Sequence, residues 1–182
     1  MCSERALPLT LAIDPGPERS GFCFYEPSSF AGELGKIQKW GWVDNAEVLT
    51  EIFHFRLTRR QRPVGGSRRD VVVIESIQAV FGTRAGRSLT DTIRAEGRFY
   101  QAAGGDDGTC YFQPRTPAAR HVSGAPSPND KAVNDGLESR FGRDAIRAMA
   151  AGCGQHARDA LALAVYWDEI GQSKHDAEVS SE

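Results

Sequence analysis

The sequence of 182 residues lacks several features that would assign it to a large class of proteins. No apolar run approaches the ~20 residues that span a bilayer, and the opening MCSERALP lacks the apolar core of a secretory signal. The four cysteines include no C-x-x-C pair, which argues against a disulfide framework or a zinc site. There is no G-x-x-x-x-G-K-[ST] phosphate loop and no internal repeat. We therefore expect a cytoplasmic protein with reduced thiols.

The composition is that of an ordinary globular protein, with 40% apolar and 25% charged residues. The length suits a single domain with a sizeable core, and we place it at residues 1–172. The last residues, 173–182, are polar and acidic, and we expect them to be disordered.

The net charge of −2 argues mildly against a nucleic-acid partner, but the charge is unevenly distributed. A local basic patch can hold a phosphate backbone even when the whole chain is nearly neutral. A solvated charged loop explains such a patch equally well. Arginines crowd residues 56–69, at Arg56, Arg59, Arg60, Arg62, Arg68 and Arg69, and Arg84 and Arg87 follow.

The stretch LTLAIDPGPERSGFCFYE organises the prediction of the fold. Leu9–Ile13 is an almost unbroken apolar run, which is typical of a strand buried on both faces. Asp14 follows it and precedes a Pro-Gly turn, and a second apolar run, Gly21–Tyr25, predicts a hairpin. Asp14 taken alone is explained by the turn that it opens.

The remaining pattern alternates strands and helices. Leu89–Ala103 follows helical spacing through Leu89, Ile93, Gly97 and Tyr100, and the last predicted helix has an apolar run at 160–167 that indicates burial. Ser127 and Pro128 would begin a helix as N-cap and first helical residue. The other predicted strands are Ile37–Val43, Asp70–Glu75 and Thr109–Phe112, and the predicted helices are Ala46–Phe55, Leu89–Ala103, Pro126–Phe141 and Gln155–Ile170. This order predicts an α/β fold with a central mixed five-stranded sheet flanked by helices.

Acidic residues stand at the ends of several predicted elements. Glu75 ends the run DVVVIE much as Asp14 ends the first strand, so parallel pairing of the two strands would bring these carboxylates together. His156 and Asp159 are three apart on the last helix and share a face. Each has an ordinary explanation as a strand end, a surface histidine or a helix-dipole partner. Together, three carboxylates would need a cation, and their oxygen ligands favour Mg²⁺ or Mn²⁺.

Three segments resemble the RuvC family of Holliday-junction resolvases, within the RNase H-like superfamily: AIDPGxxxSGF, VVVIESIQAVFGTRAGRS and GQHARDALALAVYW. The resemblance runs from Leu9 to Trp167 and implies a crossover junction endodeoxyribonuclease with two Mg²⁺ ions per site, for which Mn²⁺ substitutes. It implies a metal set in which Asp14 bridges the two ions. Glu75 and Asp159 each complete one shell, and His156 orients or deprotonates the attacking water. Lys131 matches a basic residue near the scissile phosphate.

The resemblance also implies a homodimer that pairs through helix Leu89–Ala103 and nicks two strands of a four-way junction symmetrically, leaving 5′-phosphate and 3′-hydroxyl ends. Phe81 is the candidate for an aromatic wedge, although it comes six residues after Glu75 and later than the family pattern places it. The residues that would contact DNA are Phe81, Arg84, Arg87, Arg115, Arg120 and Lys131.

Within this resemblance, three features suggest a divergent member of phage type: the long arginine-rich segment, the added length at Gly142–Gly154, and the low overall charge. We expect such a protein to work in a bacterial or phage-infected cell. Two alternatives stay open: a nuclease of the same superfamily that cuts flaps, other branched DNA or RNA–DNA hybrids, and a non-catalytic junction-binding module. An actin-like kinase shares the first hairpin, but it would need a second nucleotide-binding half for which 182 residues leave no room.

Overall fold

The structure is a computed structural model, and it describes residues 9–28, 34–61, 70–77, 87–105, 107–171 and 173–174. A five-stranded sheet forms its centre, with the strand order β3-β2-β1-β4-β5. β2 pairs antiparallel with β1 and β3, whereas β4 pairs parallel with β1 and β5, so the predicted mixed sheet is confirmed. The strands are β1 (Thr10–Asp14), β2 (Arg19–Glu26), β3 (Lys36–Asp44), β4 (Val71–Ser76) and β5 (Cys110–Pro114).

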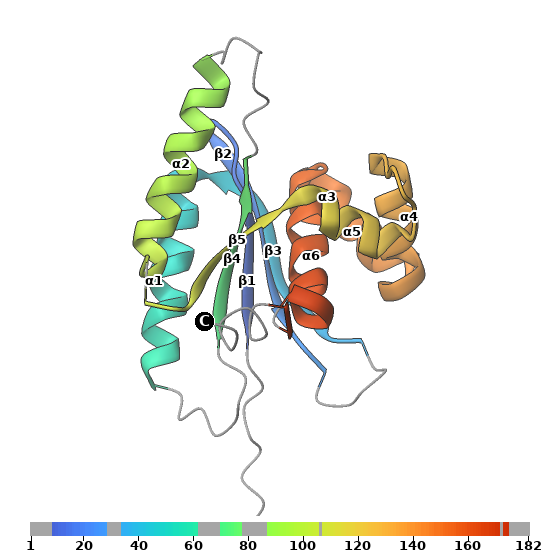
Figure 1. Cartoon of the computed structure of the whole chain (residues 1–182), viewed down its shortest axis with the longest axis horizontal. Helices are drawn as coiled ribbons and strands as arrows, with labels where there is room; N and C mark the ends of the chain where they lie inside the picture. Colours follow the sequence, from blue (N-terminus) through green and yellow to red (C-terminus); the bar gives the residue numbers. More distant parts are fainter. Residues whose placement is uncertain are drawn as a thin grey trace, which may run out of the picture.

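Helices cover both faces of the sheet, with α1 and α2 on one face and α3 to α6 on the other (Figure 1). The helices are α1 (Asn45–Gln61), α2 (Arg87–Ala103), α3 (Arg115–Ser123), α4 (Asp130–Phe141), α5 (Arg143–Cys153) and α6 (His156–Tyr166), and a π-helical turn, η1 (Trp167–Gly171), follows α6. Within the described ranges, no helix has both the length and the apolar character needed to cross a membrane.

The burial of β1 on both faces divides the core in two. Leu11 and Ile13 point toward α1 and α2, where they pack in a cluster with Ile52 and Phe99. Ala12 points the other way, into a cluster built largely from α6. The unbroken apolar run of β1 therefore serves two hydrophobic layers, as its sequence predicts.

The alanine-rich helix α6 lies close against β1 and β2, as its sequence predicts. The closest approach is at Gly21, where a Cβ atom would lie 2.4 Å from the backbone carbon and oxygen of His156. Only glycine leaves room for the start of α6 at this point. Gly21 therefore sets how near His156 comes to the sheet.

The structure corrects the predicted start of the helix at Pro126–Phe141. The helix begins at Asp130, and Asn129, not Ser127, is its N-cap, because the Asn129 side chain accepts a hydrogen bond from the Ala132 amide at 2.9 Å. Pro128 precedes the cap and is not the first helical residue. An asparagine amide oxygen placed three residues before that N–H satisfies it directly.

Two helices, α3 and α5, were not predicted as elements. Arg115 and Arg120, predicted as DNA contacts, both lie within α3. The sequence pattern indicates only added length at Gly142–Gly154, whereas most of this segment is α5. Alanine fills much of the buried side of α3, so the usual pattern of large apolar residues is missing there.

The buried face of α2 also differs from the predicted one. Ala95, Phe99 and Ala103 face the core, whereas Ile93 is 44% exposed. The stripe predicted from Leu89, Ile93, Gly97 and Tyr100 therefore lies to the side of the core-facing residues. Helix α2 begins at Arg87, two residues before the predicted start at Leu89, and residues 78–86 lie outside the described residues.

The cysteines of the described segments are free, with Cys23 and Cys110 buried and Cys153 half-buried, in agreement with the prediction of reduced thiols. Cys2 lies outside these segments.

We predict that Gly21→Ala lowers the free energy of unfolding by about 1–3 kcal/mol, because the added methyl group forces α6 away from β2. The matched control is Gly97→Ala on α2, where a Cβ atom meets nothing within 4 Å. This control should raise the free energy of unfolding by about 0.5–1 kcal/mol. Urea titrations of both variants measure the two effects, and a neutral Gly21→Ala would contradict the close packing described above.

Candidate active site

Four predicted side chains come together at one edge of the sheet. β1 and β4 are parallel neighbours in register Ile13 with Ile74, so Asp14 and Glu75 leave adjacent strands at the same edge. The first turn of α6 brings His156 and Asp159 to that edge. The cluster therefore combines residues from three segments that are far apart in the sequence.

A partly buried polar network fixes the turn that follows Asp14. The Gly16 amide donates to the Ser20 hydroxyl at 3.1 Å, and that hydroxyl donates to the Asn45 side-chain oxygen at 2.6 Å. The Asn45 side-chain nitrogen then donates to the Gly16 carbonyl at 3.1 Å. Ser20 and Asn45 were not singled out from the sequence, since each is a common turn or cap residue. Their network holds the end of β1 rigid, and Asp14 with it.

His156 is paired with Asp14. Its Nδ1 lies 2.6 Å from Oδ2 of Asp14, a residue that is only 7% exposed. The hydrogen bond to Asp14 is the main reason that the pKa of His156 is raised above its usual value. The pair thus favours an imidazolium beside a carboxylate.

The charged form of Glu75 is disfavoured by its surroundings. Burial, reinforced by the nearby charges of Asp14 and Asp159, raises the pKa of Glu75 to about 8. Its Oε2 atom is buried and has no hydrogen-bond partner among the described residues. A buried oxygen without a partner is costly, so this carboxylate is poised to accept a proton or a cation.

Asp159 is held by two neighbours. Arg115 Nη2 lies 3.0 and 3.1 Å from its two oxygens, and Nε2 of the Gln155 side chain donates to Oδ1 at 2.9 Å. Burial raises the pKa of Asp159, while Arg115 and Gln155 act in the opposite direction. Arg115 also reaches Asp130 at 2.8 Å, so it links α6 to the start of α4. Arg115 was predicted as a DNA contact, and its place beside the carboxylates was missed because it depends on the fold of α3.

Trp42 is the other neighbour that sequence reasoning missed. Its indole stacks on the His156 imidazole with ring centroids 6.0 Å apart and planes at 12°. The register that pairs Gly21 with Trp42 puts it there, and that register is not evident from the sequence.

Of the remaining predicted site residues, three are exposed on α2, α3 and α4, and two lie outside the described part of the chain. Lys131 is exposed on α4 and pairs with Asp135 at 2.6 Å. Arg120 is exposed and lines, with Arg115, a polar cavity of about 240 Å³ between α3 and the start of α4. Arg87 is exposed at the start of α2, 3.9 Å from Asp91. Phe81 and Arg84 fall in residues 78–86, which the structure does not describe.

The donors of this cluster suit a hard divalent cation, since they are three carboxylates and one imidazole. In the described segments, however, no group of three or more His, Cys, Asp or Glu side chains already has the arrangement of a metal site. The present pairings explain this, because His156 takes an oxygen of Asp14 and Arg115 takes both oxygens of Asp159. The orphaned oxygen of Glu75 and its raised pKa fit a site that a cation would relieve.

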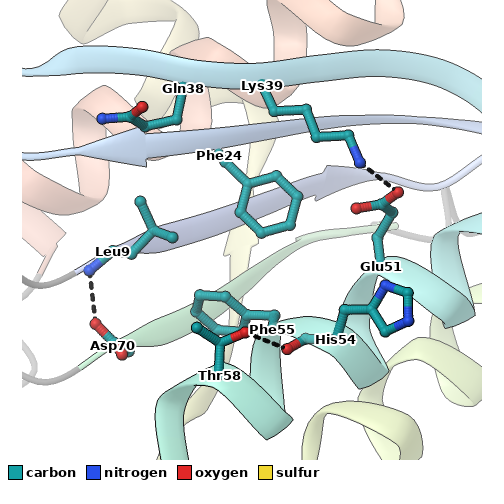
Figure 2. Close-up of a pocket in the computed structure, with 9 residues that line it drawn as sticks. All are labelled: Leu9, Phe24, Gln38, Lys39, Glu51, His54, Phe55, Thr58 and Asp70. Carbon is teal, nitrogen blue, oxygen red and sulfur yellow. Dashed lines mark hydrogen bonds and ion pairs between the residues drawn. The ribbon is translucent and has the colours of Figure 1, made fainter. Parts of the chain in front are cut away.

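A larger, mostly apolar cavity of about 300 Å³ lies at the other end of the sheet, lined by residues such as Leu9, Phe24 and Phe55 (Figure 2). Several of its polar groups are engaged locally, as in the Leu9 amide with Asp70 at 2.7 Å and Lys39 with Glu51 at 2.6 Å. Ligands of open α/β sheets bind off the carboxyl ends of the strands. The carboxylate cluster satisfies that rule and this cavity does not.

Comparison with known proteins shows the fold. No family model matches the sequence, and no curated protein matches it. The structure is similar to that of Thermus thermophilus RuvC, with a TM-score of 0.55 and 16% identity over 90% of this chain and 96% of RuvC. It is also similar to T. thermophilus RuvC in complex with a Holliday junction substrate, with a TM-score of 0.59 and 17% identity over the same shares of each chain. The predicted resemblance is thus confirmed for the structure, and the chain has the RNase H-like fold of RuvC.

Proposed function

We propose that the chain is a metal-dependent endonuclease that resolves Holliday junctions by paired symmetric nicks. The observation that carries the proposal is the convergence of Asp14, Glu75, Asp159 and His156 at one edge of the sheet. Carboxylates that raise one another's pKa are typical of functional sites, and especially of sites that hold cations. The RuvC fold supports a nuclease, and one of the two similar structures is bound to a junction.

The residues of the cluster would divide the work as follows. Asp14, Glu75 and Asp159 would hold two Mg²⁺ ions, with His156 as a further ligand. Ions bound there supply an activated water and stabilise the leaving oxygen of the phosphodiester. Once a cation replaces His156 at Asp14, the half-exposed imidazole loses the contact that raises its pKa, and in its neutral form it could take the proton of that water. Ion binding requires Asp14 and Asp159 to exchange their present partners, His156 and Arg115, for the cations.

Basic side chains near the cluster would hold the DNA. Arg115 and Arg120 line one polar cavity beside the site, and Lys131 lies on the neighbouring helix α4. Lys131 would leave Asp135 to steady the charge on the scissile phosphate. Arg87, Arg84 and Phe81 complete the proposed DNA path, the last two in residues that the structure does not describe.

The proposed homodimer would pair through α2. Ile93 is 44% exposed on this helix, and Leu89 one turn before it is half-buried. Tyr100, two turns after Ile93, stacks on Phe112 with ring centroids 4.8 Å apart, and Phe112 is itself 44% exposed. This apolar stripe, which runs from α2 onto the edge strand β5, gives a second copy a surface to cover.

We predict that the wild-type chain nicks a labelled four-way junction symmetrically in Mg²⁺ or Mn²⁺ and not in EDTA. Asp14→Asn should lower the rate of cleavage at least about 10³-fold, because it removes a charge from the centre of the cluster. A gel assay that includes linear duplex, a flap and an RNA–DNA hybrid as competing substrates measures both effects.

The competing substrates separate the alternatives. Better cutting of the flap or the hybrid would keep the nuclease and overturn the junction as substrate. Junction binding without any cutting would overturn the enzyme and favour a binding module.

We predict that Glu75→Gln stabilises the metal-free protein at pH 8 by about 1–3 kcal/mol and abolishes cleavage. Because the folded pKa of Glu75 lies above its unfolded value, wild-type stability falls as pH rises from about 4.5 to about 8. The difference in stability between Glu75→Gln and the wild type should therefore shrink toward pH 5, where Glu75 is protonated. Thermal melts in EDTA at both pH values test this, and an equal advantage at the two would show that charge repulsion is not its cause.

We predict that Ile93→Glu converts the protein from a dimer to a monomer in sedimentation velocity, since it puts a charge into the apolar stripe. Arg98→Gln makes the same unit change in charge at an exposed position of α2 away from the stripe, and it should leave the dimer intact. A dimeric Ile93→Glu would place the interface elsewhere.

A further inference from the structure

Asp14, Gly21 and Trp42 lie side by side on three neighbouring strands, and His156 packs over them. Asp14 pairs with Gly21 across β1 and β2, and Gly21 pairs with Trp42 across β2 and β3. Residues directly opposite one another on paired strands point to the same face, which here is the face under α6. His156 lies over Gly21, with Asp14 on one side and Trp42 on the other.

The indole of Trp42 is itself fixed from β2. The Arg19 guanidinium carbon lies 3.9 Å from the centroid of the indole ring, and Arg19 donates to the Trp42 carbonyl at 2.7 Å. Arg19 is also 3.5 Å from Asp44, which keeps the guanidinium on β3. The indole nitrogen is buried and has no hydrogen-bond partner among the described residues. Ring contacts therefore hold the indole in place, in line with the preference of arginine for aromatic faces.

His156 needs such support. Its side chain is 46% exposed at the first residue of α6, and a side chain there would otherwise move between rotamers. A near-parallel stack on Trp42 restricts the imidazole to its own plane. Within that plane, Nδ1 meets the Asp14 carboxylate at 2.6 Å.

We propose that Trp42, backed by Arg19, is a positioning residue that fixes the plane of the His156 imidazole and so keeps its nitrogen edge turned toward the carboxylate cluster. This inference rests on the proposed function, because it assigns to Trp42 a part in building the same site. Residues that orient a metal ligand typically change metal affinity or activity by 10–100-fold when they are removed.

The test compares Trp42→Leu, which removes the ring, with Trp42→Phe, which keeps one. Trp40→Leu is the matched control, because Trp40 lies two residues away on the same strand and face but packs into the core cluster. Junction cleavage at saturating Mg²⁺ gives kcat and KM, and calorimetry without DNA gives the affinity for Mn²⁺. Thermal melts of each variant confirm that it is folded.

We expect Trp42→Leu to lower kcat and Mn²⁺ affinity at least tenfold, with KM changed less than about threefold. Trp42→Phe should recover most of both losses, and Trp40→Leu should keep wild-type kcat. Unchanged kcat and Mn²⁺ affinity in Trp42→Leu would overturn the proposal. A rise in KM alone would also overturn it, since it would mean that Trp42 contacts DNA and does not position His156. Equal losses in the Phe and Leu variants would overturn it too.

A structural readout separates this inference from the proposed function. The ring current of an aromatic residue at position 42 should shift the His156 ring protons in NMR spectra of the wild type and Trp42→Phe. The shift should be lost in Trp42→Leu, with the signals assigned through His156→Gln. If wild type cleaves no DNA, the proposed function fails, while this shift and the Mn²⁺ affinities still decide the role of Trp42. Arg19→Gln should reduce both the ring-current shift of His156 and the affinity for Mn²⁺. If neither quantity changes, Arg19 has no part in positioning His156.

Discussion

The parallel pairing of β1 with β4 is the constraint on which the rest of the site depends. The register of Ile13 with Ile74 carries two carboxylates off the same edge of a buried sheet. Helix α6 then packs on β1 and β2 through its alanines and brings Asp159 to that edge. The strand burial that stabilises the fold therefore also concentrates negative charge at the strand ends. The raised pKa of Glu75 is a consequence of this concentration.

Two basic side chains pair with carboxylates of the cluster. His156 pairs with Asp14, and Arg115 pairs with Asp159, so Glu75 is left with an oxygen that has no partner among the described residues. In this arrangement basic side chains offset part of the negative charge of the carboxylates, and a divalent ion would offset it more strongly. The same pairings account for the lack of open metal geometry in the described segments, and they name the two contacts that an entering ion must replace.

How far the sequence predicts this structure depends on how local each signal is. Long apolar runs and the Asp-Pro-Gly turn were enough to predict β1, β2 and β4, and hence the edge where Asp14 and Glu75 meet. Helices α3 and α5 were missed, and α4 was given the wrong cap. Arg115 and Trp42 could not be placed, since their contacts depend on the packing of α3 and on the register of β3. The residues that meet in the cluster were thus predictable, and their supporting residues were not.

The central claim is that the carboxylates are gathered to hold cations, and anomalous diffraction from crystals grown with Mn²⁺ tests it most directly. Our account predicts Mn²⁺ peaks about 2.1 Å from oxygens of Asp14, Glu75 and Asp159. It also predicts that Arg115 has turned away from Asp159 and that the present contact of His156 with Asp14 has been exchanged for the ion. Crystals with saturating Mn²⁺ that show no peak at this edge, with both of those pairs intact, would contradict it.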